Sequence, residues 1–174
     1  MKTMKKSNLI IIIIVAVLVC LIAVFAILNQ NSLPMPSKGK DLLVFSEDGT
    51  RKEYTVEEIK KFHSLDFEKT ISSSKEEDES GLFTGIPIEL LLADVAPDWE
   101  EKYIEVIFTA EDAFISSVFA SDISVGENVM LVFQKDGKPL PSKEEGGKGP
   151  LRIVIRDDPF GNRSTYLLKT IELK

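Results

Sequence analysis

The sequence is poor in the residues that most often carry catalysis. It contains one cysteine, Cys20, and one histidine, His63, among 174 residues. Zinc sites are built mainly from cysteine and histidine, and a catalytic triad needs a histidine beside its nucleophile. Cys20 lies in a long apolar run, so the remainder of the chain offers no disulfide and no thiolate ligand. We therefore expect neither a metal site of this kind nor a hydrolytic triad.

The N-terminus lacks acidic residues and carries only three basic ones, Lys2, Lys5 and Lys6. An uninterrupted apolar run from Leu9 to Leu28 follows, about the 20 residues that a helix needs to cross a bilayer. The basic side stays in the cytoplasm, which predicts a single-pass cell-membrane anchor with an extracytoplasmic C-terminal domain. A cleaved signal peptide is the alternative, although its apolar region is usually only about 7–15 residues long.

These features divide the chain into four segments. They are a cytoplasmic basic tail (1–8), a transmembrane anchor (9–28), a polar, proline-containing linker (29–40) and one globular domain (41–174). All 28 acidic residues but only 18 of the 21 basic ones follow the anchor, so the exported part has a formal charge of −10. Such a surface repels nucleic acid and anionic lipid headgroups, so we expect no nucleic-acid partner.

The globular part has the pattern of an α+β domain dominated by mixed β-sheet. A tight turn at Asp48-Gly49 predicts a hairpin between Asp41 and Thr55. Apolar residues at helical spacing predict a helix that has Pro87 in its first turn and runs to Val95. From Tyr103 onward, one strand pattern follows another. In all, we expect two short helices and about eight strands.

Two polar features of the first half carry weaker functional signals. Thr55 and Glu58 form a capping box, which predicts a short helix with His63 on its apolar face. A lone histidine on such a helix is expected at the edge of the core or on the surface. The acidic run from Lys75 to Ser80 lacks the ligand spacing of a calcium loop, so we expect a solvated loop there.

The end of the chain combines a glycine-rich loop with a strand. In residues 151–156, three apolar side chains alternate with a set that contains Arg152 and Arg156, which places both arginines on one face. The strand pattern predicts that the apolar set faces a core. The arginine face could hold an anion, aided by free amides of Gly146, Gly147 and Gly149, or it could face water and pair with nearby acids.

Four segments now occur in an order that is typical of one family. They are Phe83-Thr-Gly-Ile-Pro-Ile-Glu-Leu-Leu-Leu92, Val129 to Pro141, Gly149-Pro-Leu-Arg-Ile-Val-Ile155 and Lys169-Thr-Ile-Glu-Leu173. Together they resemble the sulfite-oxidase-like domains, the oxidoreductase molybdopterin-binding family, over most of residues 42–173. The resemblance implies an α+β fold with a mixed sheet, a molybdenum-pterin cofactor in a cleft and oxo transfer at the metal.

The resemblance also implies a metal ligand that this sequence lacks. In the family, a cysteine thiolate before the Thr-Gly-Val-Pro segment binds molybdenum, but Asp66 to Gly81 contains no cysteine. The nearest candidates are Ser72, Ser73 and Ser74, whose hydroxyls are harder and far less acidic than a thiol. The N-terminus also has no arginine pair of the kind that marks export of a folded protein. We therefore expect no cofactor, with molybdopterin as the alternative.

The resemblance leaves four basic residues and one glycine as candidates to bind an anion or a pterin phosphate. They are Lys148, Gly149, Arg152, Arg156 and Arg163. Three functions follow, in order of preference. The first is a degenerate module that binds a small anionic ligand or an envelope protein. The second is a molybdopterin-dependent oxidoreductase with a non-cysteine metal environment, and the third is a structural envelope domain.

Overall fold

The computed structural model describes residues 14–24, 34–72 and 77–174. The chain forms two compact units, residues 1–33 and residues 34–174, and each is described by itself. In the first unit, residues 14–24 are helical and their side chains are exposed. No helix in the described ranges is both long and apolar enough to cross a membrane. The predicted span from Leu9 to Leu28 extends beyond the described helix at both ends.

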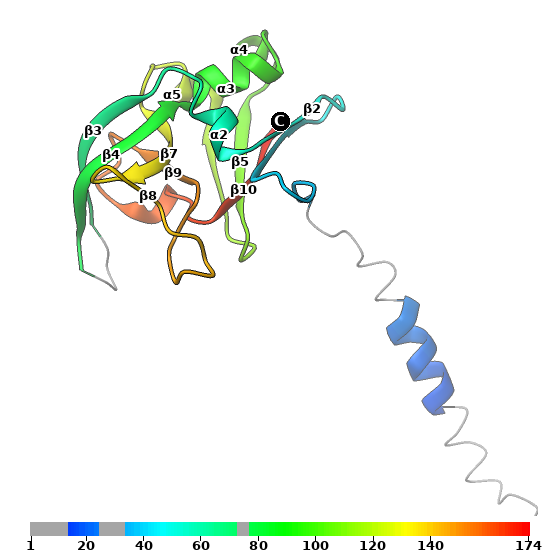
Figure 1. The fold of residues 1–174 in the computed structure, drawn as a ribbon. Coiled ribbons are helices and arrows are strands. Elements are labelled where there is room, and N and C mark those ends of the chain that lie inside the picture. Colours follow the sequence, from blue (N-terminus) through cyan, green and yellow to red (C-terminus); the bar gives the residue numbers. More distant parts are fainter. Residues whose placement is uncertain (1–13, 25–33, 73–76) are drawn as a thin grey trace, which may run out of the picture. The chain divides into compact units, whose positions relative to one another are not determined.

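The second unit consists of ten strands, four short α-helices and one 3-10 helix within its described residues (Figure 1). In chain order these elements are β1 (Leu42–Ser46), β2 (Arg51–Tyr54), α2 (Val56–Ile59), β3 (Leu65–Ile71), β4 (Glu79–Pro87), α3 (Ile88–Val95), α4 (Trp99–Lys102), β5 (Glu105–Ala110), β6 (Ile115–Phe119), α5 (Ala120–Ile123), β7 (Val129–Lys135), β8 (Lys138–Pro139), β9 (Arg152–Ile155), η1 (Gly161–Arg163) and β10 (Leu168–Leu173).

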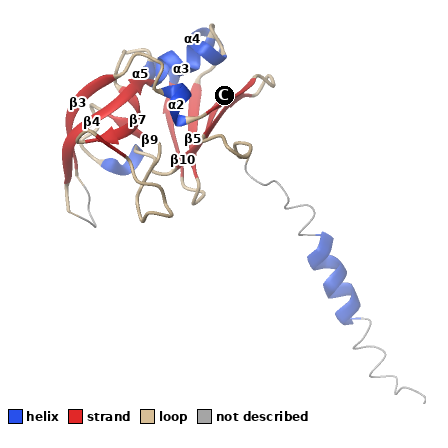
Figure 2. Cartoon of the chain, in the orientation of Figure 1, coloured by secondary structure: helices blue, strands red, loops and turns tan. Residues whose placement is uncertain are grey.

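The strands form two sheets. The first has the order β2-β1-β10-β5-β6, and β1 and β10 run parallel while its other pairs are antiparallel. The second has the order β3-β4-β7-β8, and β9 also pairs with β7. Figure 2 shows the α-helices of this unit gathered at one end of the two sheets. The parallel pair confirms the predicted mixed sheet.

The main hydrophobic core joins the two sheets. Phe108 and Ile171 come from the first sheet, Leu131 and Ile153 from the second, and all four are fully buried in one cluster. Helix α3 adds one apolar face to this cluster, with buried residues Ile88, Leu91, Leu92 and Val95. The apolar residues that recur at helical spacing in the sequence are therefore the ones that pack against the sheets.

A second, smaller cluster covers the other face of the second sheet. Its buried residues are Phe67, Ile71, Phe83, Met130, Val132, Leu140 and Val154. Since successive side chains of a strand point to opposite faces, β9 contributes Ile153 to the main core and Val154 to this cluster. The alternative in which the arginine face points to water is wrong for Arg152, because both faces of β9 are buried and Arg152 is 1% exposed.

Local signals predicted the short-range structure well. The hairpin β1–β2 turns at Gly49, which has a φ of 92°. Thr55 caps α2 with both hydrogen bonds of a capping box. Its side chain accepts from the Glu58 amide, and the Glu58 side chain accepts from the Thr55 amide. However, α2 ends at Ile59, so His63 follows the helix and is exposed.

Other boundaries differ from the expected ones. Pro87 is the last residue of β4 and the N-cap of α3, not a residue of the first turn. Helices α4 and α5, of four residues each, were not expected. The predicted acidic loop was wrong at its end, because Glu79 and Ser80 begin strand β4.

Candidate functional site

Arg152 is the charged residue most deeply buried in the described part of the domain. It is the first residue of β9, and the Gly149–Pro150 peptide bond just before this strand is cis. The guanidinium lies between two aromatic rings, with Cζ 4.9 Å from the Phe83 ring and 4.7 Å from the Tyr166 ring. A planar cation between two ring faces gains cation-π attraction, which holds the side chain in one orientation.

One carboxylate neutralises part of this charge. Arg152 Nη1 donates to both carboxylate oxygens of Glu79, at 3.1 and 3.0 Å, and Lys135 Nζ donates to Oε1 of the same residue at 3.1 Å. Burial alone would raise the pKa of Glu79, but the positive charges of Arg152 and Lys135 outweigh it and hold this pKa below its ordinary value. Glu79 is therefore an anion shared by two cations at neutral pH.

The opposite edge of the guanidinium has no partner. Nε and Nη2 of Arg152 are buried and form no hydrogen bond within the described residues. These two nitrogens form the edge that binds a carboxylate or a phosphate through two parallel hydrogen bonds. Leaving a buried donor unpaired costs about 1–3 kcal/mol, and more when the group is charged. Within the described residues, this edge of the guanidinium therefore has the geometry to bind an anion but no hydrogen-bond partner.

A large cavity adjoins this guanidinium. Its volume is about 1010 Å³, and its charged lining residues are the cations Lys135, Lys138, Lys148 and Arg152 and the acids Glu77, Asp78, Glu79 and Asp136. Lys148 Nζ lies 4.9 Å from the centre of the Tyr166 ring, on which Arg152 also stacks. Because the formal charges of the lining cancel, the cavity suits a ligand with one anionic group better than a polyanion.

The glycine loop contributes shape and not amide donors. The amide of Gly147 donates to the Ser142 carbonyl and that of Gly149 to the Pro141 carbonyl, both at 2.8 Å, while Gly146 donates to the Lys143 carbonyl. The prediction of free amides at these three glycines was therefore wrong. At Gly147 a Cβ atom would lie 2.1 Å from the Pro141 carbonyl oxygen, so the loop needs glycine there to pack against the segment that lines the cavity.

The structure separates the basic candidates from one another. Lys148 and Arg152 line the cavity, but Arg156 and Arg163 do not. Arg156 donates to the carboxylate of Glu127 at 3.2 Å and lies over the Phe67 ring. Arg163 donates from Nε to Asp158 at 2.9 Å and is about half exposed. These two arginines form ordinary ion pairs of the kind that the sequence offered as the alternative to an anion site.

Of the three serine candidates for the missing thiolate, the structure describes only Ser72. Ser72 Oγ donates to Asp78 at 3.2 Å, and its amide donates to the Pro159 carbonyl. Ser72 does not line the cavity beside Arg152, and Ser73 and Ser74 lie outside the described residues. The described residues also contain no cluster of three or more His, Cys, Asp or Glu side chains placed to hold a metal. The groups present fit an anion but not a cysteine-ligated molybdenum centre.

Glu79 is the residue that sequence reasoning missed. It was assigned to a solvated acidic loop, whereas it begins β4 and pairs with Arg152, 73 residues later in the chain. The alternation of Glu79, Gly81 and Phe83 on one face of the strand was the available signal. Only the pairing of β4 with β7, and of β7 with β9, brings the two charges together.

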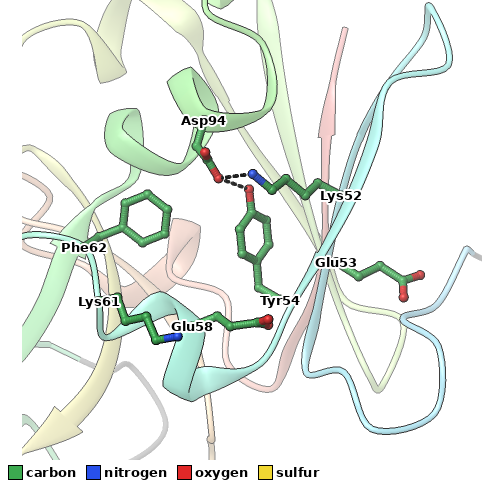
Figure 3. Close-up of a pocket in the computed structure, with 7 residues that line it drawn as sticks. All are labelled: Lys52, Glu53, Tyr54, Glu58, Lys61, Phe62 and Asp94. Atoms are coloured by element: carbon green, nitrogen blue, oxygen red, sulfur yellow. Dashed lines mark hydrogen bonds and ion pairs between the residues drawn. The ribbon is translucent and has the colours of Figure 1, made fainter.

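A second pocket, of about 340 Å³, lies between β2, α2 and α3 (Figure 3). There the Tyr54 hydroxyl and Lys52 Nζ both donate to Asp94, at 2.7 and 2.6 Å. Burial and the neighbouring carboxylate raise the pKa of Tyr54, and the two donors lower that of Asp94. Because Tyr54 stays protonated at neutral pH and donates to Asp94, this cluster fastens β2 to α3. None of the predicted site residues lines this pocket.

Comparison with known proteins agrees with this fold. Residues 34–174 match the family described as the oxidoreductase molybdopterin binding domain, and the chain belongs to this family. The sulfane dehydrogenase SoxCD from Paracoccus pantotrophus has a similar structure, with a TM-score of 0.64 and 14% sequence identity. The match covers 83% of this chain but only 40% of that one, so the likeness concerns the fold. A search of curated proteins gave no match.

Proposed function

We propose that this chain is an exported, membrane-anchored member of the family that binds a small anionic ligand beside Arg152 and does not carry out molybdenum redox chemistry. The observation that carries the proposal is the unpartnered Nε–Nη2 edge of a buried guanidinium next to a cavity. A carboxylate or phosphate group would satisfy both donors at once through two parallel hydrogen bonds.

The conformation of the site determines how the ligand enters. Nε and Nη2 are buried, so a ligand reaches them only after a neighbouring side chain shifts. Tyr166 stacks on the guanidinium and is only half-buried, and Lys148 lies over the same ring. We expect Tyr166 and Lys148 to move together when the anion enters. Binding of this kind is slower than binding to an open patch.

The inventory of metal ligands supports a function without molybdenum. The domain has no cysteine, and its only histidine is exposed after α2. Membership in the family supports the competing function, a molybdopterin-dependent oxidoreductase with a different metal environment. The two functions differ in a measurable quantity, the molybdenum content of the native protein.

The sequence of the first 28 residues supports the proposed membrane anchor. Three lysines precede the apolar run, and the described helix over 14–24 exposes large apolar side chains such as Leu18, Leu21 and Ile22. Exposed apolar side chains all round a helix are typical of a segment whose surroundings are lipid. The competing signal peptide would be cut away, so the mass of the mature protein separates the two.

The first experiment is elemental analysis of the full chain purified from native membranes. We expect molybdenum far below one atom per chain and no visible charge-transfer absorption. Stoichiometric molybdenum would contradict the proposal and favour the oxidoreductase.

A second experiment tests the anion itself. Inorganic phosphate, sulfate and acetate are titrated into the full chain, and the shift in unfolding temperature is compared between the wild type, Arg152→Met and the exposed control Arg163→Met. We expect saturable stabilisation in the wild type and the control, and its loss in Arg152→Met. Equal stabilisation in all three proteins would show that the anions act on the surface and not at Arg152.

A further inference from the structure

The first sheet ends in an unusual edge strand. Strand β6 pairs only with β5 among the described strands, so one side of it carries no ladder. Exposed edges are usually protected by charged residues, proline or bulges because they can pair with another chain. The edge strands β2 and β3 follow this rule, since each contains three charged residues. In contrast, the chain has no charged residue and no proline from Ala113 to Ser121.

The hydrogen-bond pattern shows which groups of β6 are turned outward. The Ala110 amide donates to the Phe114 carbonyl, and the Ala120 amide donates to the Ile104 carbonyl, one at each end of the β5–β6 ladder. In an antiparallel pair, alternate residues turn their amide and carbonyl to the neighbour. Ile115, Ser117 and Phe119 therefore direct these groups away from β5.

Two of these three residues, Ile115 and Phe119, carry the exposed side chains of the strand, and Ser117 between them is half-buried. Ser116 and Val118 point to the core side, where Val118 is buried and Ser116 hydrogen-bonds Thr165. On the opposite face, Ile115 is 54% and Phe119 is 61% exposed. A neutral strip with open backbone groups and two large apolar side chains thus lies along one edge of a domain whose net charge is strongly negative.

We propose that β6 pairs with β6 of a second copy of this chain, antiparallel and about a two-fold axis through Ser117. In this register Ser117 lies opposite Ser117 of the second copy, and Ile115 lies opposite Phe119 in both directions. All three are hydrogen-bonding positions, so every outward amide and carbonyl of the strand finds a partner. The two five-stranded sheets become one continuous sheet across the axis.

The occupant is a second copy because the strip is complementary to itself. The symmetric register matches a branched side chain with an aromatic one twice, and such cross-strand pairs stabilise antiparallel sheets. Two negatively charged domains repel one another elsewhere, so contact is favoured where neither copy carries charge. The pairing does not involve the cavity, and it is independent of whether an anion binds at Arg152.

The decisive variant is Ser117→Lys, which places two ammonium groups face to face on the axis. The matched control is Ser64→Lys, which makes the same change at an exposed position just before β3. The mass of the full chain in detergent is measured against concentration by analytical ultracentrifugation. We expect a dimer for the wild type and the control. For Ser117→Lys we expect the dissociation constant of the dimer to rise at least about tenfold, because like charges opposite one another destabilise a strand pair.

Cross-linking in native membranes checks the register without relying on detergent. In a Cys20→Ser background, Ser117→Cys should give a disulfide-linked dimer on mild oxidation, since paired residues in this register lie close to one another. Ser64→Cys should remain monomeric under the same conditions. A wild type that stays monomeric, a dimer that survives Ser117→Lys unchanged, or equal cross-linking at both positions would each overturn the proposal.

Discussion

Strand β9 presents two faces that differ in how completely they are satisfied. Towards the first sheet it sends Ile153 and Ile155 into the main hydrophobic core. Towards the other side it sends Val154 and Arg152, and Arg152 meets two rings, one carboxylate and a cavity. The first face holds the fold together. The second face holds a charged group, Arg152, two of whose nitrogen atoms have no hydrogen-bond partner within the described residues.

The largest expected effect lies on the apolar face. Ile153→Ala removes a fully buried side chain from the core and should destabilise the domain by about 2–5 kcal/mol. Denaturant unfolding measures this loss, and the affinity of the folded fraction for sulfate should not change. A change in sulfate affinity as large as that of an Arg152 variant would show that the two faces are not separate.

On the polar face, Glu79→Gln removes the carboxylate that neutralises Arg152. We expect a loss of about 1–3 kcal/mol, because a buried guanidinium is left without its charged partner. Added sulfate should recover more stability in this variant than in the wild type, since it replaces the missing negative charge. Thermal unfolding with and without sulfate measures both effects, and a variant that sulfate does not rescue would contradict the assigned anion site.

The pH dependence of the stability of the domain should come partly from the Arg152–Glu79 pair. Arg152 and Lys135 lower the pKa of Glu79 in the folded state. The contribution of the Glu79 carboxylate to the free energy of unfolding is therefore fully present above the ordinary pKa that Glu79 has in the unfolded chain. That contribution is lost as the pH falls through the lower folded value. The stability of Glu79→Gln should therefore fall less steeply below about pH 4.5 than that of the wild type. Parallel curves of unfolding free energy against pH would rule out this role for Glu79.

The smallest effect is expected outside the site. Arg163 forms an exposed pair with Asp158, and such pairs contribute about 0–1 kcal/mol. Arg163→Met should therefore leave both stability and sulfate affinity nearly unchanged. A marked loss of sulfate binding would move the anion site from β9 to the segment around η1.

Short-range features were the most predictable from the sequence. The Asp-Gly hairpin, the Thr55 capping box and the apolar face of α3 each depend on residues within one turn or one element. The alternation of residues 151–156 located Arg152 on a strand beside the glycine loop. The sequence could not predict the partner of Arg152, because the Glu79 contact depends on the pairing of three strands.

The sequence also misjudged what the glycine loop does. Its amides were expected to be free for an anion, but the loop folds back on the 140–142 segment and uses them in backbone hydrogen bonds. A run of glycines predicts conformational freedom and not the partners that the backbone will find. In the same way, the arginine spacing predicted a shared face but not that Arg156 pairs with Glu127.

The most direct test observes the Arg152 edge itself. In a proton–nitrogen NMR titration of the full chain, Arg152→Lys identifies the Arg152 Nε–H signal, because lysine has no such group. With inorganic phosphate or acetate, we predict a saturable shift of that signal, while the Nε–H signal of the exposed Arg163 stays in place or changes only in proportion to added salt. A signal of Arg152 that does not move, or that moves exactly as Arg163 does, would contradict the claim that this guanidinium is an anion-binding site.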